Sequence, residues 1–286
     1  MNLHLKNITF IIVCFKSQNI IYECLDSLPE DSNKIIIENS RNLNLKKNLE
    51  HKYKNIEVIF NDNIGFGASN NMGIKVSKTQ FVFVLNPDVK FRKDTFDNLV
   101  KACNNISNFA IISPMHSDYK YPNYTIKKQY KTIDENIIEV DEIDGFSMLI
   151  NKQMFKNNDF FDENFFLYLE NNDLCLRTKK KGLNIYIIKN SLIDHKGGAS
   201  TDPDLLDDLQ YLKNWHWMWS KFYYNRKHFG YVYGFFKISR NLISALLKFL
   251  FYLILGNNKK KLFYKARFSG CINAMILKKS WYRPKI

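Results

Sequence analysis

The sequence predicts an α/β protein with a Rossmann-like, mostly parallel sheet flanked by helices, followed by a basic, aromatic-rich helical extension. Apolar, β-branched runs have the composition of strands that are buried on both faces. Segments with helical spacing separate these runs, and strands that alternate with helices indicate parallel βαβ units. A sharp change in charge near residue 205 predicts the extension.

The first apolar run, residues 8–15, is interpreted as a buried strand and not as a secretory signal. It is short, has no basic segment before it and no small-residue cleavage site after it. Asp94 is expected to cap a helix that runs to about residue 104. The elements expected as far as that residue are strands at 8–14, 34–37, 56–60 and 81–85, and helices at 20–28, 65–76 and 95–104.

The pattern is less regular in the following hundred residues. Residues 119–141 are polar and are expected to form a surface excursion, and residues 143–150 are a further apolar segment. A helix is expected at residues 172–181, closed by Gly182. Two short strands are expected after it, at residues 185–188 and 191–195.

Composition excludes several classes of protein. The chain has 286 residues, of which 45% are hydrophobic and 24% charged, so it is not collagen-like, disulfide-dense or mostly disordered. The net charge of +14 lies in residues 205–286, which hold sixteen Lys and Arg but two acidic residues. The five cysteines form no C-x-x-C pair and no zinc-type spacing, which favours a reduced, cytosolic setting.

The extension is interpreted as helical and membrane-associating. Residues 205–225 are rich in Trp and Tyr, and residues 231–255 are strongly apolar but interrupted by Lys237, Arg240 and Lys248. The longest clean apolar stretch is shorter than the ~20 residues of a spanning helix. A helix lying in the membrane surface is preferred to a nucleic-acid patch, since no binding motif is present, and to a hairpin packed on the core.

Polar residues follow each of the first four expected strands. They are Lys16 and Ser17, Glu38 to Ser40, Asn61 to Asn63, and Asn86 to Asp88. The carboxyl ends of parallel strands share one edge of a sheet, where open α/β sheets bind their ligands. The pattern predicts a nucleotide-sized site, and plain turns are the alternative because these residue types favour turns.

Five segments in order carry a resemblance to a known family. They read VCFKS, IIIENS, NDNIGFGASNNMG, FVFVLNPDV and FDENFFLYLENNDLCLR, and HKGGAS lies downstream. Together they resemble the inverting glycosyltransferases of family 2, and within it the bacterial rhamnosyltransferase-like branch. The resemblance covers about residues 8–200 and implies a GT-A domain at residues 1–204, with residues 205–286 as the helical extension.

The resemblance implies a divalent metal, Mn²⁺ or Mg²⁺, which neutralises the diphosphate of a nucleotide-sugar donor. The family's acidic metal-binding motif corresponds to Asn86-Pro87-Asp88, in which only Asp88 offers a carboxylate. His195 stands where relatives complete the metal site with a histidine. A strand-ending turn is the alternative for Asp88, and a structural role is the alternative for His195.

The glycine-rich segment resembles the family's donor site. Gly65 and Gly67 remove side-chain bulk, so backbone can approach a ligand, and Asn70 adds an amide; a bare glycine turn is the alternative. Glu38 stands where the family usually has an Asp that contacts the nucleoside. The residues expected to bind the donor are Phe15, Ser17, Glu38, Asn63, Gly65, Gly67, Asn71 and Asn86.

The inverting mechanism needs one general base. Relatives commonly read Glu-Asp-x-Asp at the start of the helix near residue 172, and the second position often supplies the base. This chain has Glu170, Asn171 and Asp173 there, and Asn171 cannot accept the proton. Glu170 and Asp173 share a helix face. Glu170 is preferred as the general base. Asp173 is expected to position the acceptor or to cap the helix. Asp144 matches the acceptor-side segment of the family.

The resemblance thus implies sugar transfer from dTDP-rhamnose or a UDP-sugar to a saccharide or a polyprenyl-diphosphate-linked saccharide. The pathway would be bacterial surface-polysaccharide synthesis, such as O-antigen or capsule. A peripheral enzyme on the cytoplasmic face of the inner membrane is expected, with no nucleic-acid partner. A catalytically weak nucleotide-sugar or glycan-binding module on the same fold is the alternative, supported mainly by Asn171.

Overall fold

The computed structural model describes residues 3–106, 108–127, 132–197 and 206–283. The chain divides into two compact units, Met1–Asp162 with Asn171–Asp202, and Glu163–Glu170 with Pro203–Ile286. The boundary expected at residues 204 and 205 lies outside the described residues, as do residues 198–200 of the HKGGAS segment. The short segment 163–170 clusters with the C-terminal helices, which the sequence did not indicate.

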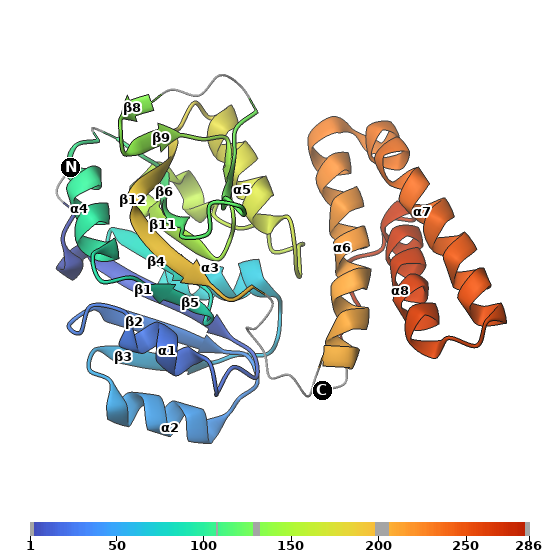
Figure 1. Cartoon of the computed structure of the whole chain (residues 1–286), viewed down its shortest axis with the longest axis horizontal. Coiled ribbons are helices and arrows are strands. Elements are labelled where there is room, and N and C mark those ends of the chain that lie inside the picture. Colours follow the sequence, from blue (N-terminus) through green and yellow to red (C-terminus); the bar gives the residue numbers. More distant parts are fainter. Residues whose placement is uncertain (1–2, 107, 128–131, 198–205, 284–286) are drawn as a thin grey trace. The chain divides into compact units, whose positions relative to one another are not determined.

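Among the described residues, a ten-stranded sheet forms the centre of the first unit, in the order β3-β2-β1-β4-β11-β6-β12-β9-β8, with β5 paired to β12 (Figure 1). Its strands are β1 Ile8–Cys14, β2 Asn33–Glu38, β3 Ile56–Phe60, β4 Phe81–Leu85, β5 Val89–Phe91, β6 Ile111–His116, β8 Thr132–Asp134, β9 Ile137–Glu139, β11 Ser147–Asn151 and β12 Ile185–His195. Strands β1 to β4 pair in parallel, and so do β6 and β12, whereas β11 is antiparallel to both its neighbours. The expected mostly parallel sheet is confirmed.

Helices flank this sheet (Figure 1). They are α1 Ile21–Asp26, α2 Leu43–Lys52, α3 Phe66–Val76, α4 Thr95–Asn104 and α5 Glu170–Lys180; short 3₁₀ turns are η1 Leu5–Asn7, η2 Lys152–Met154 and η3 Lys156–Asn158. Asp94 precedes α4 as expected, but its side chain makes no capping hydrogen bond. Gly182 closes α5 with a φ of +73°, and the Leu183 N–H donates to the Thr178 carbonyl at 3.2 Å. This is the Schellman geometry that Gly favours.

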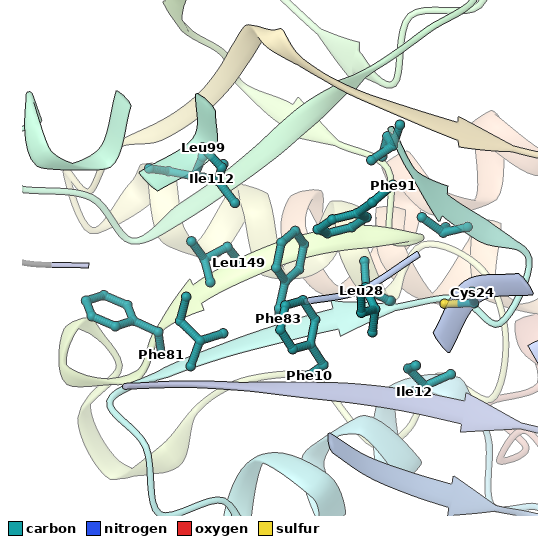
Figure 2. Close-up of a cluster of buried hydrophobic side chains, with 14 of the residues drawn as sticks. Phe10, Ile12, Cys24, Leu28, Phe81, Phe83, Phe91, Leu99, Ile112 and Leu149 are labelled. Atoms are coloured by element: carbon teal, nitrogen blue, oxygen red, sulfur yellow. The ribbon is translucent and has the colours of Figure 1, made fainter. Parts of the chain in front are cut away.

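Both faces of the central strands β1, β4 and β11 are buried, which explains their continuous apolar runs. Side chains alternate along β1, so Phe10 lies in one hydrophobic cluster and Ile11 in another. Figure 2 shows the first cluster, where the Phe10 and Phe83 rings stack with centroids 5.4 Å apart and Phe83 contacts Phe91 at 5.4 Å. All seven residues of β1 are buried, so residues 8–14 form a strand as predicted.

Two sequence-based expectations are wrong. Residues 119–141 are more than a surface excursion, because β8 and β9 extend the sheet and Ile137 and Ile138 are buried. A second, two-stranded sheet pairs β7 Tyr124–Thr125 with β10 Glu142–Ile143. Residues 185–195 form one strand, since β12 stays paired with β6 across a register shift between Ile188 and Leu192. Polar residues at that irregularity interrupt the apolar pattern, so the sequence suggests two strands.

The second unit is a bundle of the helices α6 Leu206–Phe229, α7 Tyr231–Ile254 and α8 Asn258–Met275, which confirms the expected helical extension. Its core includes Trp215 and Phe222 of α6. At Gly270 of α8 a Cβ would lie 2.3 Å from the Trp215 carbonyl oxygen, so only Gly permits this approach. Burial lowers the pKa of His216 to about 3. Among the residues that the structure describes, no helix is both long and apolar enough to cross a bilayer.

Candidate active site

The loops after β1 and β2 are joined by hydrogen bonds at the carboxyl edge of the sheet. The Lys16 N–H donates to Ser40 Oγ at 3.2 Å, and Ser40 Oγ donates to the Glu38 carboxylate. Asn39 extends the network, because its amide donates to Ser69 Oγ of α3 at 2.9 Å. The polar residues that follow β1 and β2 therefore meet at this edge, as expected.

Glu38 organises its own loop. Its side chain is buried, Oε1 accepts from the Ser40 N–H at 3.1 Å, and Oε2 accepts from the Asn42 N–H at 2.5 Å. With the Ser40 hydroxyl, these bonds use three of the roughly four acceptor positions of a carboxylate. Glu38 thus holds the loop in shape, and its contact with a nucleoside stays a prediction.

Four further residues at this edge are expected to bind the sugar donor, and two of them, Phe15 and Ser17, lie in the turn after β1. Lys16 has a φ of +53°, and the buried Ser17 hydroxyl accepts from the Phe15 N–H at 3.2 Å. Asn63 is half-buried in the loop before α3, and Asn86 donates its N–H to the Phe146 carbonyl at 3.0 Å. Donor contacts by Phe15, Ser17, Asn63 and Asn86 stay predictions.

The glycine-rich segment opens α3. Gly65 has a φ of +111°, which a residue with a side chain adopts only with strain, and Gly67 is buried in the first turn. Asn70 donates to the Phe66 carbonyl at 3.0 Å, whereas its Oδ1 is buried without a hydrogen-bond partner in the described chain. A buried acceptor without a donor costs about 1–3 kcal/mol. Asn70 is therefore better suited to meet a ligand than the sequence alone indicates.

Asn71 has a structural role that the sequence did not reveal. Its Nδ2 donates to the Phe161 carbonyl at 2.8 Å, and its Oδ1 accepts from the Phe161 N–H at 3.0 Å. The side chain is buried and ties α3 to the backbone of Phe161. Both ends of the amide bond the backbone, and the expected donor contact by Asn71 stays a prediction.

Asp88 and His195 are brought together by the pairing of β5 with β12. Val89 lies opposite His195 in that antiparallel pair, and His195 Nε2 is 3.4 Å from Asp88 Oδ1. The Phe146 ring stacks on the imidazole with centroids 3.9 Å apart and an interplanar angle of 19°. The sequence predicts both polar residues but not Phe146, because an aromatic in an apolar run is indistinguishable from a core residue.

The polar atoms of this pair lack hydrogen-bond partners. Both carboxylate oxygens of Asp88 and the Nε2 of His195 are buried with no hydrogen bond in the described part of the chain. A buried charge without compensation is costly, so the pair fits a divalent cation. The described residues contain no group of three or more His, Cys, Asp or Glu placed to hold a metal. Two protein ligands are sufficient where substrate phosphates and water complete the coordination, as is common for Mg²⁺.

Asp144 is the carboxylate that the sequence predicts on the acceptor side. It lies in the turn between β10 and β11, where its N–H donates to the Asn123 carbonyl at 2.9 Å. Burial raises the pKa of Asp144, and His195 and His116 partly oppose that rise. The charges of His195 and His116 therefore act on Asp144, and its acceptor-side role stays a prediction.

Asp173 is engaged in an ion pair. Its carboxylate is fully buried and accepts from Arg177 Nε at 2.8 Å, one helical turn along α5. Arg177 also donates to the Asp159 carbonyl at 3.0 Å. This arrangement fixes α5 against the preceding segment, which is a structural role that the sequence did not show. The guanidinium of Arg177 occupies one oxygen of this carboxylate, which an acceptor hydroxyl would otherwise contact.

Glu170 is the first residue of α5 and is 5% exposed. The two residues before it, Tyr168 and Leu169, have φ values of +72° and +67°, and such backbone strain clusters at functional sites. Burial raises the pKa of Tyr168 to about 12, and the charge of Glu170 adds to that rise. The ion pair of Asp173 with Arg177 argues against that carboxylate as the base, and the assignment of Glu170 stays a prediction.

The segment Glu163–Glu170 packs against α6, and both belong to the second unit. The Phe165 ring contacts Tyr223 at a centroid distance of 4.9 Å, and the Tyr168 ring contacts Trp217 at 5.3 Å. Ser220 Oγ donates to the Leu167 carbonyl at 2.8 Å. The helical unit therefore helps to shape the backbone on which the candidate base is placed.

Asn171 supports the Asp144 turn. Its Nδ2 donates to the Ile143 carbonyl at 2.8 Å, and a Cβ on Gly145 would lie 3.2 Å from the Asn171 Cβ. The amide N–H is required, because a carbonyl oxygen can only accept. An acidic residue at this position would face the Ile143 carbonyl with a second acceptor.

Asn171→Asp, which restores the family's usual carboxylate, is therefore expected to lower the free energy of unfolding by about 1–3 kcal/mol at pH 8. The loss should shrink at acidic pH, where a protonated Asp can donate to the Ile143 carbonyl. Chemical denaturation at several pH values measures both effects. Asn44→Asp, at an exposed position of α2, is the matched control and should unfold like the parent chain. Equal stability of Asn171→Asp and the parent at pH 8 would refute the role of this hydrogen bond.

Comparisons with known proteins identify the family of the chain. The family model described as Glycosyl transferase family 2 matches residues 9–192. The low-salt glycan biosynthesis hexosyltransferase Agl10 of Haloferax volcanii is 26% identical over 200 residues, which cover 63% of this chain and 64% of Agl10. The rhamnosyltransferase WbbL of Escherichia coli K12 is 24% identical over 208 residues, which cover 62% of this chain and 79% of WbbL. The match thus spans less than two thirds of the length of Agl10.

Solved structures share the fold. Staphylococcus aureus TarS 1–349 aligns with a TM-score of 0.51 at 13% identity, covering 96% of this chain and 93% of the TarS chain. The mannosyltransferase PcManGT of Pyrobaculum calidifontis, in complex with GDP-Man and Mn²⁺, aligns with a TM-score of 0.55 at 10% identity, covering 94% and 86%. At these identities the likeness establishes the GT-A fold alone.

Proposed function

Because the chain belongs to glycosyltransferase family 2, we propose that it transfers a sugar from a nucleoside-diphosphate donor to a saccharide hydroxyl, with inversion at the anomeric carbon. The observation that carries the proposal is the pair of Asp88 and His195, in which both carboxylate oxygens and the imidazole Nε2 are buried without hydrogen-bond partners in the described chain. The pair lies at the end of β4 and β12, where open α/β sheets bind ligands.

Asp88 and His195 are the residues that would hold a divalent metal, Mn²⁺ or Mg²⁺. Such an ion supplies neutralisation of the negative charge that develops on the leaving diphosphate. The mannosyltransferase of similar fold was solved with GDP-Man and Mn²⁺, which supports this assignment. The stacked Phe146 ring holds the imidazole plane and excludes water from one of its faces.

Glu170 is proposed as the general base. It takes the proton of the acceptor hydroxyl as that oxygen bonds to the anomeric carbon and the bond from that carbon to the diphosphate breaks. Asp144 is proposed to hold the acceptor hydroxyl, with its turn fixed by Asn171 and Asn123. Asp173 serves to fix α5 through Arg177 and leaves the proton transfer to Glu170.

The donor is proposed to be dTDP-rhamnose or a UDP-sugar, bound between the β1 and β2 loops and the start of α3. Support comes from the names of the relatives, a rhamnosyltransferase and a hexosyltransferase of glycan biosynthesis. The proposed acceptor is a saccharide or a polyprenyl-diphosphate-linked saccharide of bacterial surface polysaccharide, such as O-antigen or capsule. The enzyme would then work peripherally on the cytoplasmic face of the inner membrane, without a nucleic-acid partner.

A catalytically weak sugar-binding module is the second candidate, because Asn171 replaces the acid that often supplies the base. The Asn171 amide, however, is bonded to the Ile143 carbonyl and so supports the acceptor-side turn. The release of nucleoside diphosphate from a panel of nucleotide sugars, with and without Mn²⁺, separates the two. An enzyme turns over a donor in the presence of metal, whereas a binding module leaves every donor intact.

A further inference from the structure

Helix α7 exposes an apolar stripe along its whole length. Its packed face consists of small or branched residues, among them Gly234, Ile238 and Ala245, which are buried. On the opposite face every fourth, third or seventh residue is apolar and exposed. These residues are Val232 (67% exposed), Phe236 (68%), Ile243 (58%), Leu247 (61%), Leu250 (44%) and Ile254 (85%). Such spacing keeps all six side chains on one side of a helix.

The stripe is bordered by cations and by no acid. Residues 209–286 contain no Asp or Glu. Lys237 of α7 lies over the Tyr233 ring at 5.3 Å, and Lys248 lies over Tyr264 of α8 at 5.3 Å. Tyr264 in turn stacks on Tyr252, with centroids 5.6 Å apart and an interplanar angle of 5°. Amphipathic rings and long basic side chains at the border of an apolar face are typical of membrane interfaces.

A lysine cluster continues this border beyond the end of α7. Lys259, Lys260 and Lys261 lie in the first turn of α8, directly after the exposed apolar end of α7. Cations at a helix N-terminus are unfavourable for the helix dipole, so helix stability does not explain their placement. Lys260 also lies over the Tyr252 ring at 5.0 Å, beside the stacked tyrosines.

We propose that the outer face of α7 docks in the plane of a bilayer that contains anionic phospholipid. The apolar stripe would enter the boundary between headgroups and acyl chains, and the bordering Lys and Arg side chains would reach the lipid phosphates. A helix of 24 residues is about 36 Å long, so the stripe offers a straight contact to a flat surface. This inference rests on the proposed function, because it names the surface by which the enzyme would bind the membrane. Its test does not depend on enzymatic activity.

The charge pattern favours a lipid surface over a second copy of the chain. A symmetric contact through α7 would bring Lys237, Arg240 and Lys248 of one copy close to the same cations of the other. Neither α7 nor α8 contains an acidic residue to offset that repulsion. An anionic bilayer neutralises these charges and covers the apolar stripe at the same time.

The test uses the full chain and flotation with two kinds of vesicle, phosphatidylcholine alone and phosphatidylcholine with phosphatidylglycerol at 3:1. In the double variant Phe236→Ser/Ile254→Ser, partitioning of the chain onto vesicles should fall about tenfold for each residue changed, because in the parent each of these side chains is buried in the lipid. The triple variant Lys259→Gln/Lys260→Gln/Lys261→Gln should lose about fivefold per lysine, only on the anionic vesicles. Leu43→Ser/Val76→Ser, which changes exposed apolar residues of the first unit, is the matched control and should float like the parent chain.

Three results would overturn the proposal. One is a parent chain that fails to float with anionic vesicles. Another is a double α7 variant that floats as well as the parent. The third is a concentration-dependent dimer, seen by sedimentation velocity, that Phe236→Ser/Ile254→Ser abolishes, because a second copy would then cover the stripe. All the changed residues are exposed or half-buried, so thermal unfolding should be unchanged, and turnover of a soluble donor should persist in every variant.

Discussion

Asp88→Asn is expected to abolish metal-dependent donor binding while the chain remains folded. Asp88 supplies the only carboxylate in the segment after β4, and both of its oxygens are buried without hydrogen bonds in the described chain. Removal of an outer-shell partner of a metal site typically costs about 10–100-fold in affinity, and the loss of a direct ligand should cost at least as much. Asn keeps the side-chain volume, so the packing against His195 is retained.

Isothermal titration with UDP and with dTDP, with and without Mn²⁺, measures this effect. The parent chain should bind a nucleoside diphosphate more tightly with Mn²⁺, and Asp88→Asn should show one affinity under both conditions. Asp94→Asn changes an exposed acid whose side chain makes no capping bond, and it should behave like the parent. Metal-dependent affinity that survives in Asp88→Asn would show that the ion is held elsewhere.

Glu170→Gln is expected to lower turnover by about 10²–10⁴-fold without changing donor affinity, which is the usual contribution of a general base. Gln is close to Glu in size, so the start of α5 should keep its packing. Steady-state kinetics and a donor titration on the same preparation separate turnover from affinity.

Asp173→Asn is the informative companion to this variant. It removes the carboxylate that pairs with Arg177, so it should lower the melting temperature, which Glu170→Gln should leave near that of the parent. Normal turnover in Glu170→Gln together with an inactive but folded Asp173→Asn would assign the base to Asp173. Normal turnover in both would leave Asp144 as the next carboxylate to test.

Local composition predicted the elements in which every side chain has the same degree of burial. The strand at residues 8–14 was predictable because all its side chains are buried, so apolar character extends over the whole run. The segment 119–141 was not, because its strands owe their place to pairing with β12, a partner distant in sequence. The assignment of residues 163–170 to the helical unit also depends on tertiary contacts, such as Phe165 with Tyr223.

The candidate site shows the same division. Asp88 and His195 could be named from the sequence through a family resemblance, but their 3.4 Å approach depends on the register of β5 with β12. The turn residues around Glu38 could be placed at the sheet edge, whereas the hydrogen bonds that occupy its carboxylate could not. From the sequence, Asn71 is expected to bind the donor and Asn171 stands in place of the usual base. Only their partners, Phe161 and Ile143, show that both amides support backbone.

Turnover of a nucleotide-sugar panel by the parent chain tests the proposed chemistry most directly. Nucleoside diphosphate release is followed by ³¹P NMR with Mn²⁺ and with EDTA, and the anomeric configuration of the sugar product is read by ¹H NMR. We expect one donor to be consumed in the presence of Mn²⁺ but not in EDTA, and its sugar product to have the inverted configuration. The same donor should remain intact with Asp88→Asn. Retention of configuration, or equal turnover in EDTA, would contradict a metal-dependent inverting glycosyltransferase with its metal at Asp88 and His195.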